Sequence, residues 1–310
     1  MINAGSGFTK ETMSGSSYRY VHWIPILMVA CVLSRVALSG QSARQQPAST
    51  AVVQEGIIKL TDSNIQYFSQ GQGEPIVLLP FGGLTVGYME GISQNLADAG
   101  YRVVRINFRG SGKSTGTGEG ITLHTLANDV AGVIKALKIE PVNIAGHAFG
   151  NRVARTLAAD HPELVHTVIL LAAGGKVPPK PPGEHALKVI FSPTSTDADV
   201  LKEMKYMVGD PAEIPMAWKM IKPSRAPEVA GLQRTAMENT PLEDWWAPPG
   251  QMKYLVLQGT DDQIAPPENG DLLKKELGAR VTVVSFPGAG HLLLVTEPKK
   301  AADAVVAFLH

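Results

Sequence analysis

The sequence predicts an α/β protein built on a doubly wound, mostly parallel β-sheet with a helical insertion. Short apolar runs that suit strands alternate with amphipathic segments of helical length along most of the chain. Residues 141–153, P-V-N-I-A-G-H-A-F-G-N-R-V, pass from a strand-like run through a glycine-flanked turn into a helix-forming run. Residues 173–250 carry proline-rich joints and short helical pieces but no strand pattern. Together these features favour one large sheet domain that carries a cap.

Length and composition agree with this division. The 310 residues exceed a usual single domain but suit a large α/β domain with an insertion. We expect a leader and linker at 1–50, a core formed by 51–172 and 251–310, and a helical cap at 173–250. The chain has 28 basic and 28 acidic residues, so its charge gives no reason to expect binding to nucleic acid.

The first fifty residues differ in character from the rest. An apolar run at 23–33 follows Arg19 and is closed by Arg35. Its eleven residues are too few for a membrane span but suit the apolar region of a signal peptide, and small residues at 39–43 offer a cleavage region. We therefore predict an exported protein, periplasmic or secreted, with no stable membrane span; a cytoplasmic location is the alternative.

Cys31 is the single cysteine of the chain. An intramolecular disulfide and a structural thiolate metal site are therefore excluded, and we predict no metal and no cofactor. The run M-V-A-C that ends at Cys31 weakly resembles a lipoprotein cleavage box, which makes a lipid anchor at Cys31 a further alternative to simple export.

The elements after residue 55 follow from their patterns in chain order. The turn residues 62–64 join two short apolar runs, which predicts an antiparallel hairpin. The continuous apolar run 76–79 suits a strand that is buried on both faces of a parallel sheet. The expected strands are 57–60, 65–68, 76–79, 101–107, 142–145, 165–172, 252–258 and 281–286. The expected helices, read from amphipathic period and stop signals, are 86–99, 121–137, 152–159, 268–277 and 299–309.

Five separated motifs occur in a definite order along these elements. They are L-L-P-F-G-G after the third expected strand, R-I-N-F-R-G-S-G-K-S after the fourth, G-H-A-F-G in 146–150, G-T-D-D-Q-I-A-P after the seventh and G-A-G-H after the eighth. On these motifs residues 56–310 resemble the α/β-hydrolase superfamily, in the branch with a helical cap after strand six. The resemblance implies the α/β-hydrolase fold and a hydrolase of the AB hydrolase-1 type.

The resemblance also implies the catalytic residues, because in this superfamily the nucleophile, the acid and the base follow in that chain order. The nucleophile position of the elbow motif G-x-S-x-G is Ala148, which lacks a hydroxyl. His291 in G-A-G-H is the expected base. The family's spacing selects Asp262 as the acid that orients the imidazole, with the adjacent Asp261 as the alternative.

Two further sets of residues complete the expected site. Resemblance assigns the oxyanion hole to the backbone N–H of Phe149 and to that of Gly82 or its neighbour Phe81. In the expected cap, the apolar rings of Trp245 and Trp246 suit the wall of a pocket for a hydrophobic substrate. The alternative for these tryptophans is that they join the cap to the core.

The missing hydroxyl leaves three hypotheses for function. In the first, His291 and Asp262 act directly on water or substrate by general acid–base chemistry, and the substrate is a small, fairly apolar ester, amide, carbamate or lactone. The G-H-A-F-G motif is similar to the elbow of aminoacrylate or carbamate hydrolases, family members with alanine at this position. In the second, the chain is a serine-type esterase whose nucleophile is replaced by Ala148. In the third, it is a ligand-binding pseudoenzyme.

Overall fold

The computed structural model describes residues 52–310, so the expected leader, its export signal and the anchor at Cys31 lie outside the described residues. One nine-stranded sheet runs through this part of the chain, in the order β1-β2-β4-β3-β6-β7-β8-β9, and β5 pairs with β2 beside that path. Its strands are β1 (Gln54–Lys59), β2 (Ser63–Gln70), β3 (Pro75–Leu79), β4 (Arg102–Ile106), β5 (Thr115–Gly116), β6 (Val142–His147), β7 (Val165–Leu171), β8 (Lys253–Gly259) and β9 (Val281–Phe286).

The strand directions confirm the expected sheet. β1 pairs with β2 antiparallel, as the hairpin prediction requires, and β2 pairs with β4 antiparallel. All neighbours from β4 through β3, β6, β7 and β8 to β9 are parallel. The carboxyl ends of these six strands therefore share one edge of the sheet, which is where parallel α/β sheets place their ligands.

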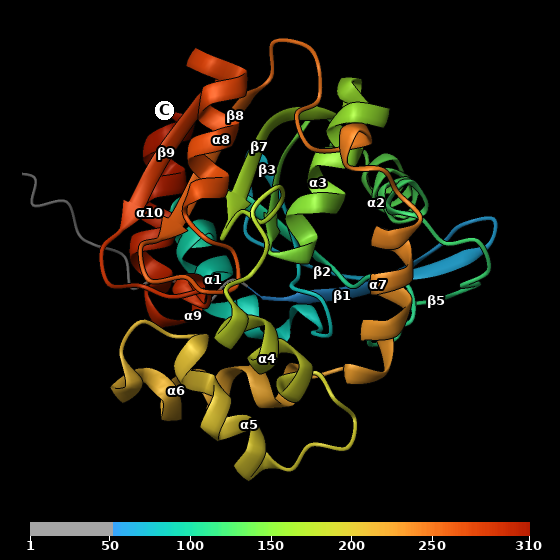
Figure 1. Cartoon of the computed structure of the whole chain (residues 1–310). Coiled ribbons are helices and arrows are strands. Elements are labelled where there is room, and N and C mark those ends of the chain that lie inside the picture. The colour runs from blue at the N-terminus through green and yellow to red at the C-terminus, as the bar shows by residue number, and fades with distance from the viewer. Residues whose placement is uncertain (1–51) are drawn as a thin grey trace, which may run out of the picture. The chain divides into compact units, whose positions relative to one another are not determined.

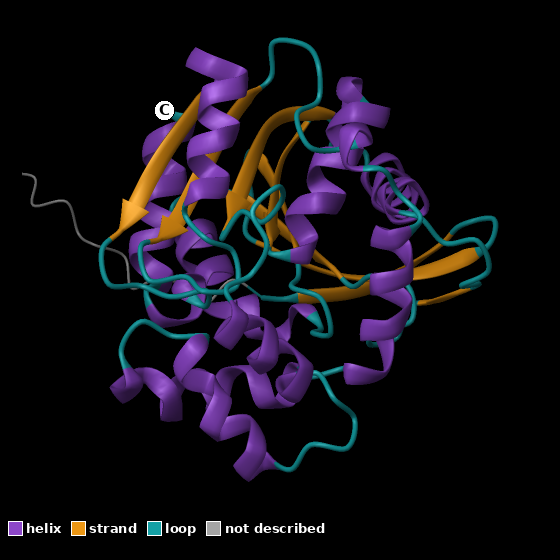
Figure 2. Cartoon of the chain, in the orientation of Figure 1, coloured by secondary structure: helices purple, strands orange, loops and turns teal. Residues whose placement is uncertain are grey.

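Helices cover both faces of the sheet (Figure 2). Successive β3 residues alternate between two apolar cores: Ile76 packs with α1 and α10, whereas Val77 packs with α2, α3 and α8. This alternation explains why the strand reads as a continuous apolar run. The covering helices are α1 (Glu90–Asp98), α2 (Leu123–Leu137), α3 (Phe149–Asp160), α8 (Glu268–Leu277) and α10 (Pro298–Leu309).

Residues 173–250, which we call the cap segment, contain helices and 3₁₀ turns. Its helices α4, α5 and α6 gather at the end of the sheet toward which β8 and β9 point (Figure 1). An isolated β-bridge between Leu84 and Arg225, together with the hydrogen bond from the Ala226 N–H to the Gly83 carbonyl at 2.8 Å, joins the segment to the turn after β3. The helices are α4 (Pro181–Ile190), α5 (Asp197–Glu203), α6 (Ile214–Ile221) and α7 (Ala230–Glu238).

Three local features differ from the sequence-based expectation. The expected helix 86–99 begins with a separate 3₁₀ turn, Val86–Met89, in which the Val86 N–H donates to Asn107 Oδ1 at 2.9 Å. The helix after the elbow begins at Phe149, three residues before the expected start at 152, because the turn passes into it directly. Strand β5 and helix α9 (Leu293–Thr296) are too short to produce a periodic pattern.

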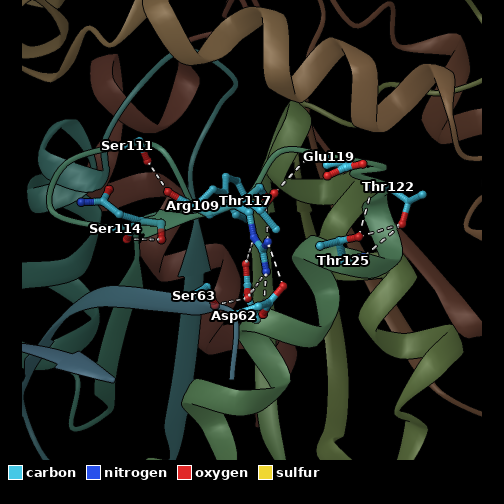
Figure 3. A network of polar contacts seen from close by, with 12 residues as sticks. Asp62, Ser63, Arg109, Ser111, Ser114, Thr117, Glu119, Thr122 and Thr125 are labelled. Carbon is cyan, nitrogen blue, oxygen red and sulfur yellow. Dashed lines mark hydrogen bonds and ion pairs between the residues drawn. The ribbon is translucent and has the colours of Figure 1, made fainter. Parts of the chain in front are cut away.

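The loop after β4 is held by a buried arginine (Figure 3). Arg109 donates to both carboxylate oxygens of Asp129 in α2, at 2.7 and 2.8 Å, and reaches Asp62 in the β1–β2 turn. Ser63, the first residue of β2, donates to Asp129 at 2.7 Å. The R-G-S-G-K-S motif therefore contributes a scaffold that ties the hairpin, the β4 loop and α2 together. Among residues 52–310, no helix has the length and apolarity that crossing a bilayer would require.

Candidate active site

A sharp turn joins β6 to α3 at Ala148. Its backbone lies at φ 50° and ψ −105°, in the left-handed region that alanine rarely adopts. A Cβ on Gly146 would lie 2.3 Å from the Gly150 backbone, and a Cβ on Gly150 would lie 2.5 Å from the Leu79 carbonyl oxygen. Only glycine permits these approaches, so the two glycines hold strand, turn and helix in the geometry of a nucleophile elbow.

Two loops at the same edge of the sheet bring a histidine and a carboxylate together. His291, which follows β9, and Asp262, which follows β8, are both fully buried, and Nδ1 of the histidine lies 2.8 Å from Oδ2 of the aspartate. Asp262 Oδ1 accepts the N–H groups of Ile264 and Ala265, each at 2.8 Å. These bonds fix the carboxylate, which in turn fixes the imidazole with its Nδ1 bearing the proton.

The neighbouring aspartate takes no part in this pair. Asp261 is exposed, and its carboxylate accepts from the hydroxyl of Thr260 at 2.9 Å. Its N–H donates to the Ala289 carbonyl, which braces the two loops against each other. Of the two candidate acids, Asp262 is therefore the one that the structure brings to His291.

The second ring nitrogen of His291 is available for chemistry. Nε2 is buried and has no hydrogen-bond partner within residues 52–310. His291 and Ala148 line the same cavity, whose volume is about 710 Å³. A neutral imidazole with its Nδ1 proton held by a carboxylate presents Nε2 as a base, so a water or substrate proton in this cavity can be accepted there.

His147 links the base to the opposite side of the site. The Phe81 N–H donates to Tyr88 Oη at 2.8 Å, which leaves the tyrosine hydroxyl to donate to His147 Nδ1 at 2.8 Å. His147 Nε2 then carries the proton and donates to the His291 carbonyl at 2.9 Å. Burial holds the pKa of His147 well below its usual range, and the neighbouring His291 lowers it further. His147 therefore stays neutral and positions the loop that carries the base.

This depressed pKa predicts an acid-sensitive contribution to stability. Below about pH 6.5 an unfolded chain binds a proton at His147 that the folded chain excludes, so the contribution is present above that pH and is lost as the pH falls below it. Urea unfolding should show the stability advantage of wild type over His147→Asn shrinking by up to about 1.4 kcal/mol per pH unit.

His124 supplies a control of opposite sign. Burial lowers its pKa, but the carboxylates of Asp160 and Asp244 outweigh this and raise it overall. The advantage of wild type over His124→Asn should accordingly grow as the pH falls. An advantage over His147→Asn that stays constant between pH 7.5 and 5.5 would contradict the neutral role assigned to His147.

The two expected oxyanion donors lie beside each other. The backbone N–H groups of Gly82 and Phe149 have no acceptor among the described residues, and both residues line the cavity. A Cβ on Gly82 would lie 3.3 Å from Phe149 Cβ, which places the two turns in direct contact. The arrangement can receive a developing negative charge above Ala148.

A residue that the sequence did not indicate also reaches this turn. Gln233 of α7 accepts the Gly83 N–H at 2.7 Å through Oε1, and its Nε2 is buried without a partner in the described part of the chain. Gln233 lines the cavity, so Nε2 is a further donor for a ligand oxygen. The 150 residues that separate it from Gly83 carry no motif that could have revealed the contact.

The expected pocket role of the two tryptophans is corrected by the structure. Trp245 and Trp246 do not line the cavity, because the Arg155 guanidinium lies over both rings, at 4.6 and 5.0 Å. Trp246 Nε1 donates to Glu276 of α8 at 2.7 Å. The indoles thus join the cap segment to the core, which was the alternative. The apolar wall of the cavity is formed instead by Phe81, Phe149, Val177, Leu187, Phe191 and Ile264.

Comparison with known proteins agrees with the fold that carries this site. Residues 74–202 match the family described as the alpha/beta hydrolase fold. This match and the fold identify the chain as an α/β-hydrolase-fold protein. Among solved structures, this α/β-hydrolase is similar to an esterase from Exiguobacterium antarcticum, with a TM-score of 0.70, 21% identity and coverage of 83% of this chain and 99% of the esterase.

Two curated relatives are also similar to this α/β-hydrolase. The 2-hydroxy-6-oxo-6-phenylhexa-2,4-dienoate hydrolase of Comamonas testosteroni is 29% identical over 255 residues, which are 75% of this chain and 86% of the relative. The (E)-2-((N-methylformamido)methylene)succinate hydrolase of Acinetobacter baylyi is 29% identical over 109 residues, 34% of this chain and 40% of the relative. The second match thus spans less than half of that relative.

Proposed function

We propose that this α/β-hydrolase cleaves a small, fairly apolar ester, amide, carbamate or lactone by direct attack of water, with His291 as general base and no covalent intermediate. One observation carries the proposal. His291 lines the same cavity as Ala148; its Nδ1 is held by a buried carboxylate, and its Nε2 has no hydrogen-bond partner within residues 52–310.

The proposed reaction follows from the donors and acceptors of the site. His291 Nε2 takes a proton from water as the water oxygen bonds to the substrate carbonyl carbon, and the negative charge that forms on the carbonyl oxygen is received by the N–H groups of Gly82 and Phe149. Asp262 stabilises the imidazolium. The imidazolium then returns the proton to the leaving oxygen or nitrogen as its bond to carbon breaks.

Ala148 argues against chemistry through an acyl-enzyme. Loss of the serine from a working triad lowers turnover by about 10⁶-fold, and the remaining rate, about 10³- to 10⁴-fold over water, comes from binding and the oxyanion hole. A methyl group in place of a hydroxyl leaves the space above the turn to a water molecule. The names of the Comamonas and Acinetobacter relatives, both hydrolases, support the reaction class.

The intact elbow geometry favours a second candidate, a serine hydrolase whose nucleophile is replaced, and Ala148→Ser separates the two. Under the proposed function, a substrate found in a panel of small esters, amides, carbamates and lactones is turned over by wild type without a burst phase. Ala148→Ser should then raise that rate by no more than about 10-fold, because the water-attack route does not use the hydroxyl.

Stopped-flow kinetics and intact-protein mass spectrometry measure the result. Ala265→Ser, which adds a hydroxyl elsewhere in the same cavity, is the matched control. A gain of about 10³-fold or more in Ala148→Ser, with a burst and an acyl adduct, would establish the replaced serine hydrolase instead. An absence of turnover by either protein across the panel would favour the third hypothesis, a ligand-binding pseudoenzyme.

A further inference from the structure

Arg152 is a charged side chain of the cavity lining that has no ion-pair partner within residues 52–310. Arg152 lies on α3 four residues after Ala148 and lines the cavity. Its Nε donates to the thioether of Met237 at 3.1 Å, a weak acceptor. Within residues 52–310, Arg152 has no carboxylate at ion-pair distance and neither of its two terminal nitrogens has a hydrogen-bond acceptor.

A second arginine on the same helix shows what a structural guanidinium looks like here. Arg155 donates to the Asn151 carbonyl and side chain, to the Trp246 carbonyl and to the Gly174 carbonyl, at 2.6–3.3 Å. Both arginines lie over the Trp245 ring, Arg155 at 4.6 Å and Arg152 at 5.1 Å. Stacking is therefore common to the two side chains, whereas hydrogen bonds to oxygen acceptors belong to Arg155 alone.

The other charges around the cavity do not compensate Arg152. Glu184 is exposed and pairs with Lys188 at 2.7 Å. Glu228 is exposed as well, and the exposed Arg234 approaches Glu238. Burial without a nearby carboxylate lowers the pKa of Arg152 to about 10, so the guanidinium remains a cation at neutral pH. A cation held in a largely apolar cavity favours an anionic ligand.

We propose that Arg152 binds a carboxylate of the substrate, so that the substrate class is a small carboxylic acid whose cleaved carbonyl group lies above Ala148. Arg152, in the first turn of α3, and Ala148, at the N-terminus of that helix, line the same cavity of about 710 Å³. The carboxylate and the cleaved bond therefore fit within one small molecule. The planar guanidinium suits bidentate binding of a carboxylate. That the bound acid is a substrate rests on the proposed function.

Binding of a matched pair of probes tests the proposal without any turnover. Hexanoate and hexanamide have nearly the same shape and differ in charge. Titration calorimetry on the full chain should show that wild type prefers hexanoate by about 10- to 100-fold, the range for a hydrogen-bonded charge pair. Arg152→Met, which keeps an apolar stem against Trp245, should lose that preference and retain its affinity for hexanamide. Arg152→Lys should keep part of the preference.

Lys188→Met removes another cation of the cavity lining and is the control, with an expected change below about 2-fold because Lys188 is exposed and already paired. Equal binding of the two probes by wild type, or an unchanged preference in Arg152→Met with a wild-type urea midpoint, would overturn the carboxylate site. Loss of turnover in His291 variants does not affect this result, and a failure to find any hydrolysed substrate would overturn the proposed function alone.

Discussion

His291→Ala is expected to lower kcat for the hydrolysed substrate by about 10²- to 10⁴-fold, the usual contribution of a general base. The reason is that His291 lines the cavity and that its buried Nε2 has no hydrogen-bond partner among the described residues. KM should change little, because the imidazole acts on the attacking water and not on the bound acid. Steady-state kinetics measure both constants, and circular dichroism checks that the fold is retained.

The adjacent aspartates provide a matched pair for the same experiment. Asp262→Asn should also lower kcat by more than about 10²-fold, since an amide cannot hold the imidazole in its required tautomer and charge state. Asp261→Asn should leave kcat within about 2-fold, because that carboxylate is exposed and bonded to Thr260. Activity of His291→Ala within about 3-fold of wild type would remove His291 from the mechanism.

Gly150→Ala is expected to destabilise the protein by about 3 kcal/mol or more, or to prevent folding. The added Cβ would lie 2.5 Å from the Leu79 carbonyl oxygen and 2.7 Å from that of Pro80. Both are backbone atoms, one at the end of β3 and one in the turn that follows it, so no side-chain rotation relieves the contact. Urea unfolding measures the free energy, and the loss should appear as a lower midpoint with an unchanged slope.

Gly231→Ala is the control for this substitution. Gly231 lies inside α7 and a Cβ there would meet nothing within 4 Å. Because alanine favours helix relative to glycine, the control should be neutral or more stable by about 0.5–1 kcal/mol. If both glycines tolerate alanine equally, the close approach of the β3 turn to the elbow does not constrain the site.

The fold was open to prediction because its signals are local. The expected helix 268–277 and the expected strand 281–286 match α8 and β9 residue for residue. The periodic spacing of apolar residues and the signals that end each element lie within or next to the element itself. The order of the motifs likewise placed the loops of Ala148, Asp262 and His291. Strand β5 was not predicted, because its two residues are too few to show a periodic pattern of apolar side chains.

The site was less predictable because its remaining contacts are long-range. Nothing near Gln233 in the sequence indicates that its side chain reaches Gly83. Trp245 and Trp246 are buried apolar rings, as expected, but they pack against Arg155 and not against the cavity. Arg155 lies about ninety residues earlier in the sequence, so only the folded chain brings it to these rings. Arg152 and Arg155 read alike in sequence and differ only in which acceptors surround them.

The backbone of the elbow has an evolutionary consequence. Ala148 keeps a left-handed conformation that costs of order 1–3 kcal/mol, although it has no hydroxyl to present. The scaffold that would aim a nucleophile is therefore complete without one. Alanine and serine codons of the GCN and TCN sets differ by one base, so a single point mutation can place a hydroxyl on a turn already shaped for it. Under the proposed function, the water-attack route and the serine route lie one nucleotide apart on the same fold, and a lineage carrying this chain can pass between them without rebuilding its core.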